Sequence, residues 1–327
     1  MSFGRIRGQA RALELLRRSL DAGRLPHALL FSGPDGVGKR QTALELAKAL
    51  NCAGPAAERD ACDACAACRL ADRGAHPDLL AVTPDGRSLK IAQVREVERH
   101  VALSAYAGRR RVAVLDAAEL MTLEAANAFL KTLEEPPSAA VLILISSAPT
   151  GLLPTIRSRC QEVRFGPLPE DVVAALLAEQ GIETEEARRA AALGGGSLTL
   201  ALAWAERFPR EKQDQVLQET QAGLASPGRA LALAKKLHEE YKGRRDLVPW
   251  LLFLLAAWAR GLARRPPEAG AAGAARPEHE PVSPRTALAF YDAVAAAQGA
   301  LESNVNLQLA LEAMLLRMHA ARRGQLP

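Results

Sequence analysis

The sequence predicts an α/β protein that begins with a parallel sheet and continues as helices alone. Apolar strand-like runs alternate with helical patterns over residues 27–165, which is typical of a parallel sheet covered on both faces. After Gly166-Pro167-Leu168-Pro169 the pattern becomes entirely helical. With 327 residues, of which 49% are hydrophobic, the chain can build two or three domains with cores.

Each element of the sheet region has its own signal. The run VLILISS (141–147) is apolar throughout, as expected of a strand buried on both faces. The predicted strands are 27–33, 79–82, 111–116, 141–147 and 163–165, and the predicted helices are 9–22, 41–50, 91–104 and 122–134. The last of these helices is stopped by Pro136-Pro137.

The helical part divides further by composition. We expect a domain over 1–168, a small helical lid over 169–208 and a helical domain over 209–327. Within the last domain, residues 249–259 are too short an apolar run to span a bilayer and predict a buried helix, and 286–322 predict one long helix. A stretch rich in Pro, Ala and Gly near 265–284 has no apolar face and predicts a disordered loop.

A phosphate-binding loop is predicted where the first strand meets the next helix. Gly33, Gly36, Gly38 and Lys39 match the pattern G-x-x-x-x-G-K, in which backbone N–H groups surround phosphate and lysine supplies a point charge. Arg40 replaces the Ser or Thr whose hydroxyl normally holds Mg²⁺. We therefore do not expect Mg²⁺, and whether ATP or ADP still binds stays open. The competing interpretation is a chance glycine loop.

Four clustered cysteines predict a structural zinc site. Cys52, Cys62, Cys65 and Cys68 have the spacing C-x9-C-x2-C-x2-C and form a module at 52–68. Free buried thiols or a C-x-x-C redox switch are the alternatives. The start of the chain has no apolar signal region, so we expect a cytoplasmic protein in which thiols stay reduced. The formal charge of +5 permits nucleic-acid binding without requiring it.

A series of segments resembles the clamp-loader ATPase family of bacterial DNA polymerase III, a group of AAA+ proteins. In chain order these segments are Gly8-Gln9, RLPHALLFSGPDGVGK (24–39), the four-cysteine module, IAQVREV (91–97), LDAAELMTLEAANAFLKTLEEPP (115–137), Ser158-Arg159-Cys160 and SNVNLQLALEAMLL (303–316). The resemblance implies an AAA+ P-loop domain, a helical lid and an all-α collar that joins subunits into a pentameric ring.

Within that family the chain resembles the non-motor delta-prime type more than the gamma/tau motors. Motors keep a hydroxyl residue where this chain has Arg40, and a glutamate directly after the Walker B aspartate. Here Asp116 is followed by Ala117, and Glu119 is out of register. Thr199 stands where the lid of a motor carries its sensor-2 arginine. The resemblance therefore implies that ATP hydrolysis by this chain is lost.

The resemblance also implies an arginine finger and a set of partners. Arg159 of the Ser-Arg-Cys triplet would reach the nucleotide site of a neighbouring motor, although a surface salt bridge is the alternative. The sensor-1 position falls in Ser146-Ser147. Expected partners are the gamma/tau and delta subunits, the sliding clamp and primer–template DNA. Candidate phosphate contacts are Arg95, Arg99 and the run 109–111, unless these charges are merely solvated.

Three other functions remain open from the sequence. The chain could be an active gamma/tau-like ATPase of the same ring. It could be a P-loop kinase of small metabolites, although such an enzyme needs the missing hydroxyl at position 40. It could also be a zinc-dependent nucleic-acid-binding module on a vestigial ATPase core.

Overall fold

The computed structural model of the chain describes residues 2–54, 60–106, 109–137, 139–244, 247–264, 282–303 and 305–325. The chain packs into two compact units, residues 1–201 and 202–327. The predicted boundaries at 168/169 and 208/209 stay predictions. Apart from 282–284, the predicted loop at 265–284 lies outside the described residues.

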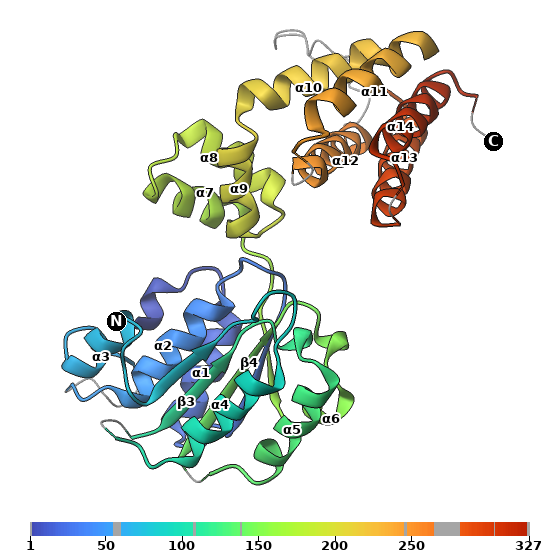
Figure 1. The fold of residues 1–327 in the computed structure, drawn as a ribbon. Coiled ribbons are helices and arrows are strands. Elements are labelled where there is room, and N and C mark those ends of the chain that lie inside the picture. Colours follow the sequence, from blue (N-terminus) through green and yellow to red (C-terminus); the bar gives the residue numbers. More distant parts are fainter. Residues whose placement is uncertain are drawn as a thin grey trace. The chain divides into compact units, whose positions relative to one another are not determined.

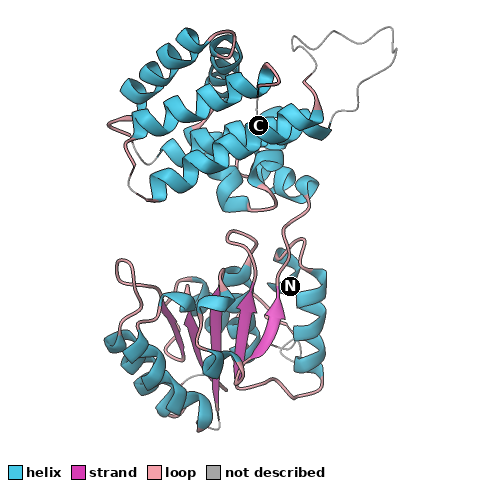
Figure 2. Cartoon of the chain, turned by 90° about the vertical axis from the view of Figure 1, so that its right-hand side faces the viewer, coloured by secondary structure: helices cyan, strands magenta, loops and turns pink. Residues whose placement is uncertain are grey.

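The first unit is built on a parallel sheet with the strand order β2-β3-β4-β1-β5, and helices cover both of its sides (Figure 2). The register pairs Leu30 of β1 with Leu144 of β4. The elements are η1 (Ser2–Arg5), α1 (Ala10–Asp21), β1 (Ala28–Ser32), α2 (Lys39–Asn51), α3 (Ala66–Asp72), β2 (Leu79–Val82), α4 (Ile91–Ala102), β3 (Arg111–Leu115), η2 (Ala118–Leu120), α5 (Leu123–Glu134), β4 (Ala140–Ser146), η3 (Pro149–Gly151), α6 (Pro154–Arg157), β5 (Gln161–Arg164), α7 (Glu170–Glu179) and α8 (Thr184–Gly194). Figure 1 shows their course.

The sheet positions the candidate site because its central strands are fully buried. Every residue of β1, β3 and β4 is buried. On one face, Val94, Val97 and Val101 of α4 and Phe129 and Leu133 of α5 pack on these strands. A parallel strand buried on both faces is apolar along its whole length, so these runs were visible in the sequence. The predicted α/β class is confirmed.

The second unit consists of helices around an aromatic centre. Trp204 is buried, and its ring lies 5.3 Å from that of Trp250 and 5.6 Å from that of Phe253, measured between centroids. The boundary between the two units falls within helix α9 (Leu198–Arg207), and Trp204 belongs to the second unit. The other helices are α10 (Arg210–Gly223), α11 (Pro227–Tyr241), α12 (Val248–Arg264), α13 (Pro284–Glu302) and α14 (Leu307–Arg322).

Two expectations for this unit had different outcomes. The apolar run at 249–259 lies in α12 and is largely buried, as predicted. The single helix predicted over 286–322 was wrong, because the chain forms α13 and α14 instead. The side chain of Asn306 caps α14 by accepting hydrogen bonds from the N–H groups of Gln308 and Leu309. This local capping starts a new helix within an otherwise continuous helical pattern.

None of the helices formed by the described residues combines the length and the apolar character needed to cross a membrane.

Candidate functional site

The predicted phosphate loop lies between β1 and α2, where it was expected. Gly38 has a φ of +97° and is the N-cap of α2, a left-handed conformation that suits glycine. At Gly33 a Cβ atom would lie 2.1 Å from the carbonyl oxygen of Phe165. These two positions require glycine because of backbone shape and close approach.

The lysine of the loop is bound by the loop itself. The Lys39 ammonium donates to the carbonyl oxygens of Gly33 and Pro34, at 2.6 Å each, and lies 3.7 Å from a carboxylate oxygen of Asp35. Its side chain is only 5% exposed. Burial lowers the pKa of Lys39, while Asp35 and the more distant acids Glu119 and Asp116 oppose that effect. The Lys39 ammonium is therefore bound by backbone carbonyl oxygens of its own loop.

Arg40 faces the acid that follows β3. Its guanidinium Nη1 lies 3.6 Å from Oδ2 of Asp116. The next residue, Ala117, has a φ of +49°, and its N–H donates to Oδ1 of Asp116. The two positions that would share a Mg²⁺ ion in an active P-loop ATPase therefore form an ion pair.

Glu119 follows β3 and binds residues that follow the neighbouring strand β4. The sequence motifs had assigned it no role. Its Oε1 accepts hydrogen bonds from the N–H of Ser147 at 3.0 Å, from the Ser147 hydroxyl at 2.8 Å and from the N–H of Ala148 at 3.3 Å. Burial works against ionisation, but hydrogen bonds, including those from Ser147, outweigh it and lower the pKa of Glu119. Because β3 and β4 are adjacent parallel strands, the residues after their carboxyl ends meet, which is a signal that could have found Glu119.

The start of α9 packs directly on the phosphate loop. The N–H of Leu198 donates to the carbonyl oxygen of Gly36 at 2.9 Å. A Cβ atom at Gly36 would lie 2.3 Å from the Ser197 hydroxyl and 2.8 Å from Oγ1 of Thr199. Thr199, which stands at the predicted sensor-2 position, is therefore brought to the loop. The predicted sensor-1 residues lie at the end of β4, where Ser146 is fully buried and Ser147 bonds Glu119.

The four predicted cysteines come together at the end of α2. Their sulfur atoms all lie within 4.8 Å of one another, and those of Cys52 and Cys65 are 4.0 Å apart. The N–H groups of Cys62, Cys65 and Cys68 each donate to a sulfur of the cluster, at 3.3–3.5 Å. Four sulfurs each about 2.3 Å from a tetrahedral zinc fit this spacing, so the residues suit the ion and could hold it.

The thiols of the cluster differ in how readily they ionise. Burial disfavours ionisation of Cys65, but the N–H groups of Cys68 and Ala53 overcome it and lower the pKa of Cys65 to about 6. Burial raises the pKa of Cys68, and the neighbouring Cys65 raises it further. Cys160 lies outside the cluster, and burial raises its pKa to about 11.

Arg159 is exposed and makes contacts within its own chain. Its Nη2 lies 2.7 Å from Oε1 of Glu134, the last residue of α5, and its Nη1 donates to the carbonyl oxygen of Thr155 at 3.0 Å. The side chains of Arg159 and Glu134 are 37% and 50% exposed. The isolated chain therefore shows the surface salt bridge that was the alternative interpretation. An exposed pair of this kind contributes little free energy and can open.

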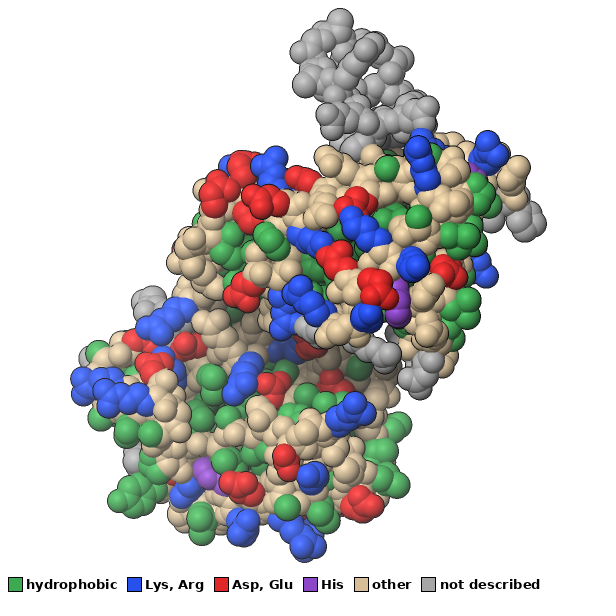
Figure 3. Space-filling model, turned by 45° about the horizontal axis from the view of Figure 1, so that its top comes forward, with side chains coloured by type: hydrophobic (Ala, Val, Ile, Leu, Met, Phe, Trp, Pro, Cys, Tyr) green, Lys and Arg blue, Asp and Glu red, His purple; other side chains and the backbone are tan. Residues whose placement is uncertain are grey.

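One predicted phosphate contact is wrong. Arg111 is buried, lies 3.2 Å from Oδ1 of Asp78, and donates to the carbonyl oxygens of Ser104 and Pro77. It fixes the start of β3, and its burial keeps it from the surface that DNA would contact. Arg95 and Arg99 are exposed on α4 and stay candidates. Basic and acidic side chains are interspersed on the face that Figure 3 shows, which agrees with a modest net charge.

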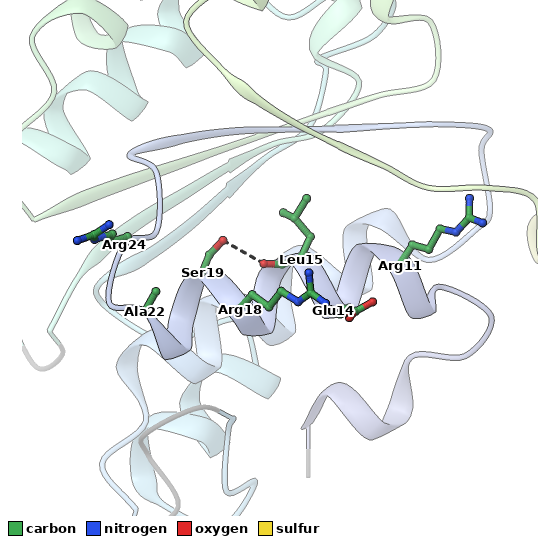
Figure 4. Close-up of a pocket in the computed structure, with 7 residues that line it drawn as sticks. All are labelled: Arg11, Glu14, Leu15, Arg18, Ser19, Ala22 and Arg24. Carbon is green, nitrogen blue, oxygen red and sulfur yellow. Dashed lines mark hydrogen bonds and ion pairs between the residues drawn. The ribbon is translucent and has the colours of Figure 1, made fainter.

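A hollow on α1 shares no residue with the phosphate loop or the cysteine cluster. Its lining residues are Arg11, Glu14, Leu15, Arg18, Ser19, Ala22 and Arg24 (Figure 4). Arg18 pairs with Glu14, the Ser19 hydroxyl donates to the Leu15 carbonyl, and Arg11 and Arg24 extend from opposite ends. Its polar groups do not converge as those of a small-molecule site do.

A parallel sheet with a phosphate loop after β1 and an acid after β3 defines a P-loop domain of the kind found in nucleotide-driven machines. A family model described as DNA polymerase III, delta subunit, matches residues 8–169. The chain is 33% identical over 245 residues to the DNA polymerase III subunit delta′ of Escherichia coli, a match that covers 74% of this chain and 72% of that protein. The chain belongs to the DNA polymerase III delta′ family, and the predicted AAA+ type is confirmed with it.

Two further similarities extend this comparison. The DNA polymerase III subunit delta′ of Bacillus subtilis is 39% identical over 180 residues, which is 55% of this chain and about half, 54%, of that protein. The crystal structure of a DNA polymerase III gamma subunit-related protein from Thermotoga maritima aligns with a TM-score of 0.45 at 20% identity, over 95% of this chain and 99% of that one.

Proposed function

We propose that this chain is a non-motor, delta-prime-type subunit of the polymerase III clamp loader. It supports ATP-dependent loading of the sliding clamp onto primed DNA without hydrolysing ATP itself. The observation that carries this proposal is the ion pair between Arg40 and Asp116. An ATPase needs a Mg²⁺ ion between a hydroxyl at position 40 and the acid after β3, and here a cationic side chain faces that acid.

Two more contacts support the loss of hydrolysis. Lys39, which would bind the β- and γ-phosphates, donates to the carbonyl oxygens of Gly33 and Pro34. The carbonyl oxygen of Gly36 accepts from Leu198, so the start of α9 packs against the loop that would surround the phosphates. Ala117 supplies no carboxylate to polarise water. A nucleotide would compete with the carbonyl oxygens of Gly33 and Pro34 for Lys39 and would still lack a metal site.

The proposed partners follow from the family and the exposed cations. We propose a hetero-pentameric ring with gamma/tau and delta subunits, in which Arg159 reaches the nucleotide of an adjacent motor. Arg95 and Arg99 offer positive charge to primer–template DNA, whose phosphates need only cationic side chains.

We also propose that the four cysteines bind a structural Zn²⁺ ion, because four thiolates leave no open position for chemistry.

Omission from a reconstituted loader tests this function. Gamma/tau and delta subunits, the sliding clamp and primed DNA are mixed with or without this chain, and loaded clamps are counted after gel filtration. We expect loading only when the chain is present. Equal loading without it would contradict the proposal.

The isolated chain is expected to show no Mg²⁺-dependent ATP turnover above background. The physical reason is the Arg40–Asp116 pair, which leaves no ligands for the metal. Phosphate release is measured for the wild type and for Lys39→Ala, which controls for a contaminating ATPase. Turnover that disappears in Lys39→Ala would identify the chain as an active gamma/tau-like motor instead.

A further inference from the structure

Lys48 is a buried cation that connects the cysteine cluster to the helix of the phosphate loop. It lies in the last turn of α2, four residues before Cys52, and its side chain is only 2% exposed. Its ammonium lies 2.7 Å from Oδ1 of Asp63, 2.7 Å from Oδ1 of Asp72 and 3.1 Å from Oε2 of Glu45. The ammonium donates hydrogen bonds to Asp63 and Asp72 and forms an ion pair with Glu45. A buried cation shared in this way holds the carboxylates in one defined geometry.

Two of these carboxylates come from the segments that carry the cysteines. Asp63 follows Cys62 directly and has a φ of +59°, a left-handed conformation that needs support from its surroundings. Asp72 is the last residue of α3, a helix that contains Cys68 and has Cys65 as its N-cap. Lys48 itself stands one turn before Cys52. Its contacts therefore fix the segments on which all four sulfur ligands lie.

Among the described residues of the module, which leave out 55–59, the apolar contacts are few. Its buried cluster consists of Cys52, Ala61 and Cys68, with Cys62 and Cys65 partly buried against it. The packing of these described residues contributes little to positioning the loops and the seven-residue helix of the module. The ion pairs of Lys48 supply the missing constraint. Arg5 adds a weaker one, because it lies 3.5 Å from Asp63 and its side chain is half exposed.

We infer that Lys48 is a positioning residue of the cysteine cluster, which preorganises the four sulfurs for a metal ion by holding Asp63 and Asp72. This inference rests on the proposed zinc site. Residues that orient metal ligands typically change metal affinity by about 10- to 100-fold when they are replaced. Removing Lys48 leaves its three carboxylates close together without their shared cation, which pushes the ligand segments apart.

The test is the rate of zinc release to a chromophoric chelator. Lys48→Met keeps most of the side-chain volume, and Lys236→Met is the matched control, since Lys236 makes an exposed pair with Glu219 in the second unit. We expect one zinc per wild-type chain, release about 10- to 100-fold faster from Lys48→Met, and an unchanged rate from Lys236→Met. Release from Lys48→Met at the wild-type rate overturns the inference.

A second variant keeps the test decisive if Lys48→Met does not fold. The side chain of Asp72 is 41% exposed, so Asp72→Asn is tolerated more easily while it still weakens one of the ion pairs. We expect faster zinc release from Asp72→Asn, with a circular dichroism spectrum like that of the wild type. Unchanged release from this variant also counts against Lys48. If the wild type itself binds no zinc, the proposed metal site fails and the role of Lys48 fails with it.

Discussion

Replacing Arg159 with alanine is expected to slow ATP hydrolysis at the neighbouring motor site by about 10³-fold or more, while the ring still assembles. A guanidinium placed against the γ-phosphate stabilises the charge of the transition state and typically accelerates the reaction by about 10³–10⁵-fold. That factor corresponds to about 4–7 kcal/mol of activation free energy. Few single substitutions in this chain should have a larger kinetic effect.

The contacts of Arg159 in the isolated chain do not oppose this role. To reach a neighbour, Arg159 must leave Glu134 and the carbonyl oxygen of Thr155. An exposed ion pair of this kind contributes no more than about 1 kcal/mol. The transition-state interaction is several times larger, so the local pair can be exchanged for the phosphate when a motor and its nucleotide are present.

The measurement uses motors whose own Ser-Arg-Cys arginine is replaced by alanine, so that Arg159 is the finger that remains. DNA-stimulated phosphate release is then compared for rings that contain the wild type, Arg159→Ala or Arg164→Ala. Arg164 is the control, because its side chain is 82% exposed and pairs with Glu162 of its own strand. Assembly is checked by gel filtration. Normal hydrolysis by an assembled Arg159→Ala ring would show that the finger assignment is wrong.

Replacing Cys62 with serine is expected to weaken zinc binding by about 10²–10³-fold. Structural zinc sites contribute roughly 10–16 kcal/mol, so one of four ligands accounts for about 3–4 kcal/mol. The hydroxyl of serine does not replace a thiolate as a soft ligand. Because the apolar cluster around the cysteines is small, the module should become easier to cleave without the metal, even though the ion pairs of Lys48 remain, while the sheet keeps its own core.

Competition titrations with a chelator measure this effect, and limited proteolysis reports the order of the module. Cys160→Ser is the matched control, since Cys160 lies outside the cluster and its partly buried thiol makes no contact with it. We expect Cys160→Ser to keep one zinc with wild-type affinity. If Cys62→Ser binds zinc as tightly as the wild type does, the four-cysteine site is not the zinc site.

Much of the fold and of the candidate site could be predicted from the sequence, because the signals for them are local. The strands β1, β3 and β4 are continuous apolar runs, since a parallel strand buried on both faces needs apolar side chains throughout. The phosphate loop was visible because backbone geometry demands glycine at Gly33 and Gly38. The cysteine cluster was visible because its four cysteines come from one short segment with the spacing typical of metal ligands.

The tertiary structure decided what depends on distant segments. Arg111 looked like part of a basic surface run, but burial beside Asp78 makes it structural. Glu119 reaches the site through the adjacency of β3 and β4, and the start of α9 packs on Gly36 across more than 150 residues of chain. Two partners of Lys48, Asp63 and Asp72, likewise lie outside its own helix. Composition and periodicity record which side chains are buried, whereas pairing between charges depends on how the chain brings remote positions together.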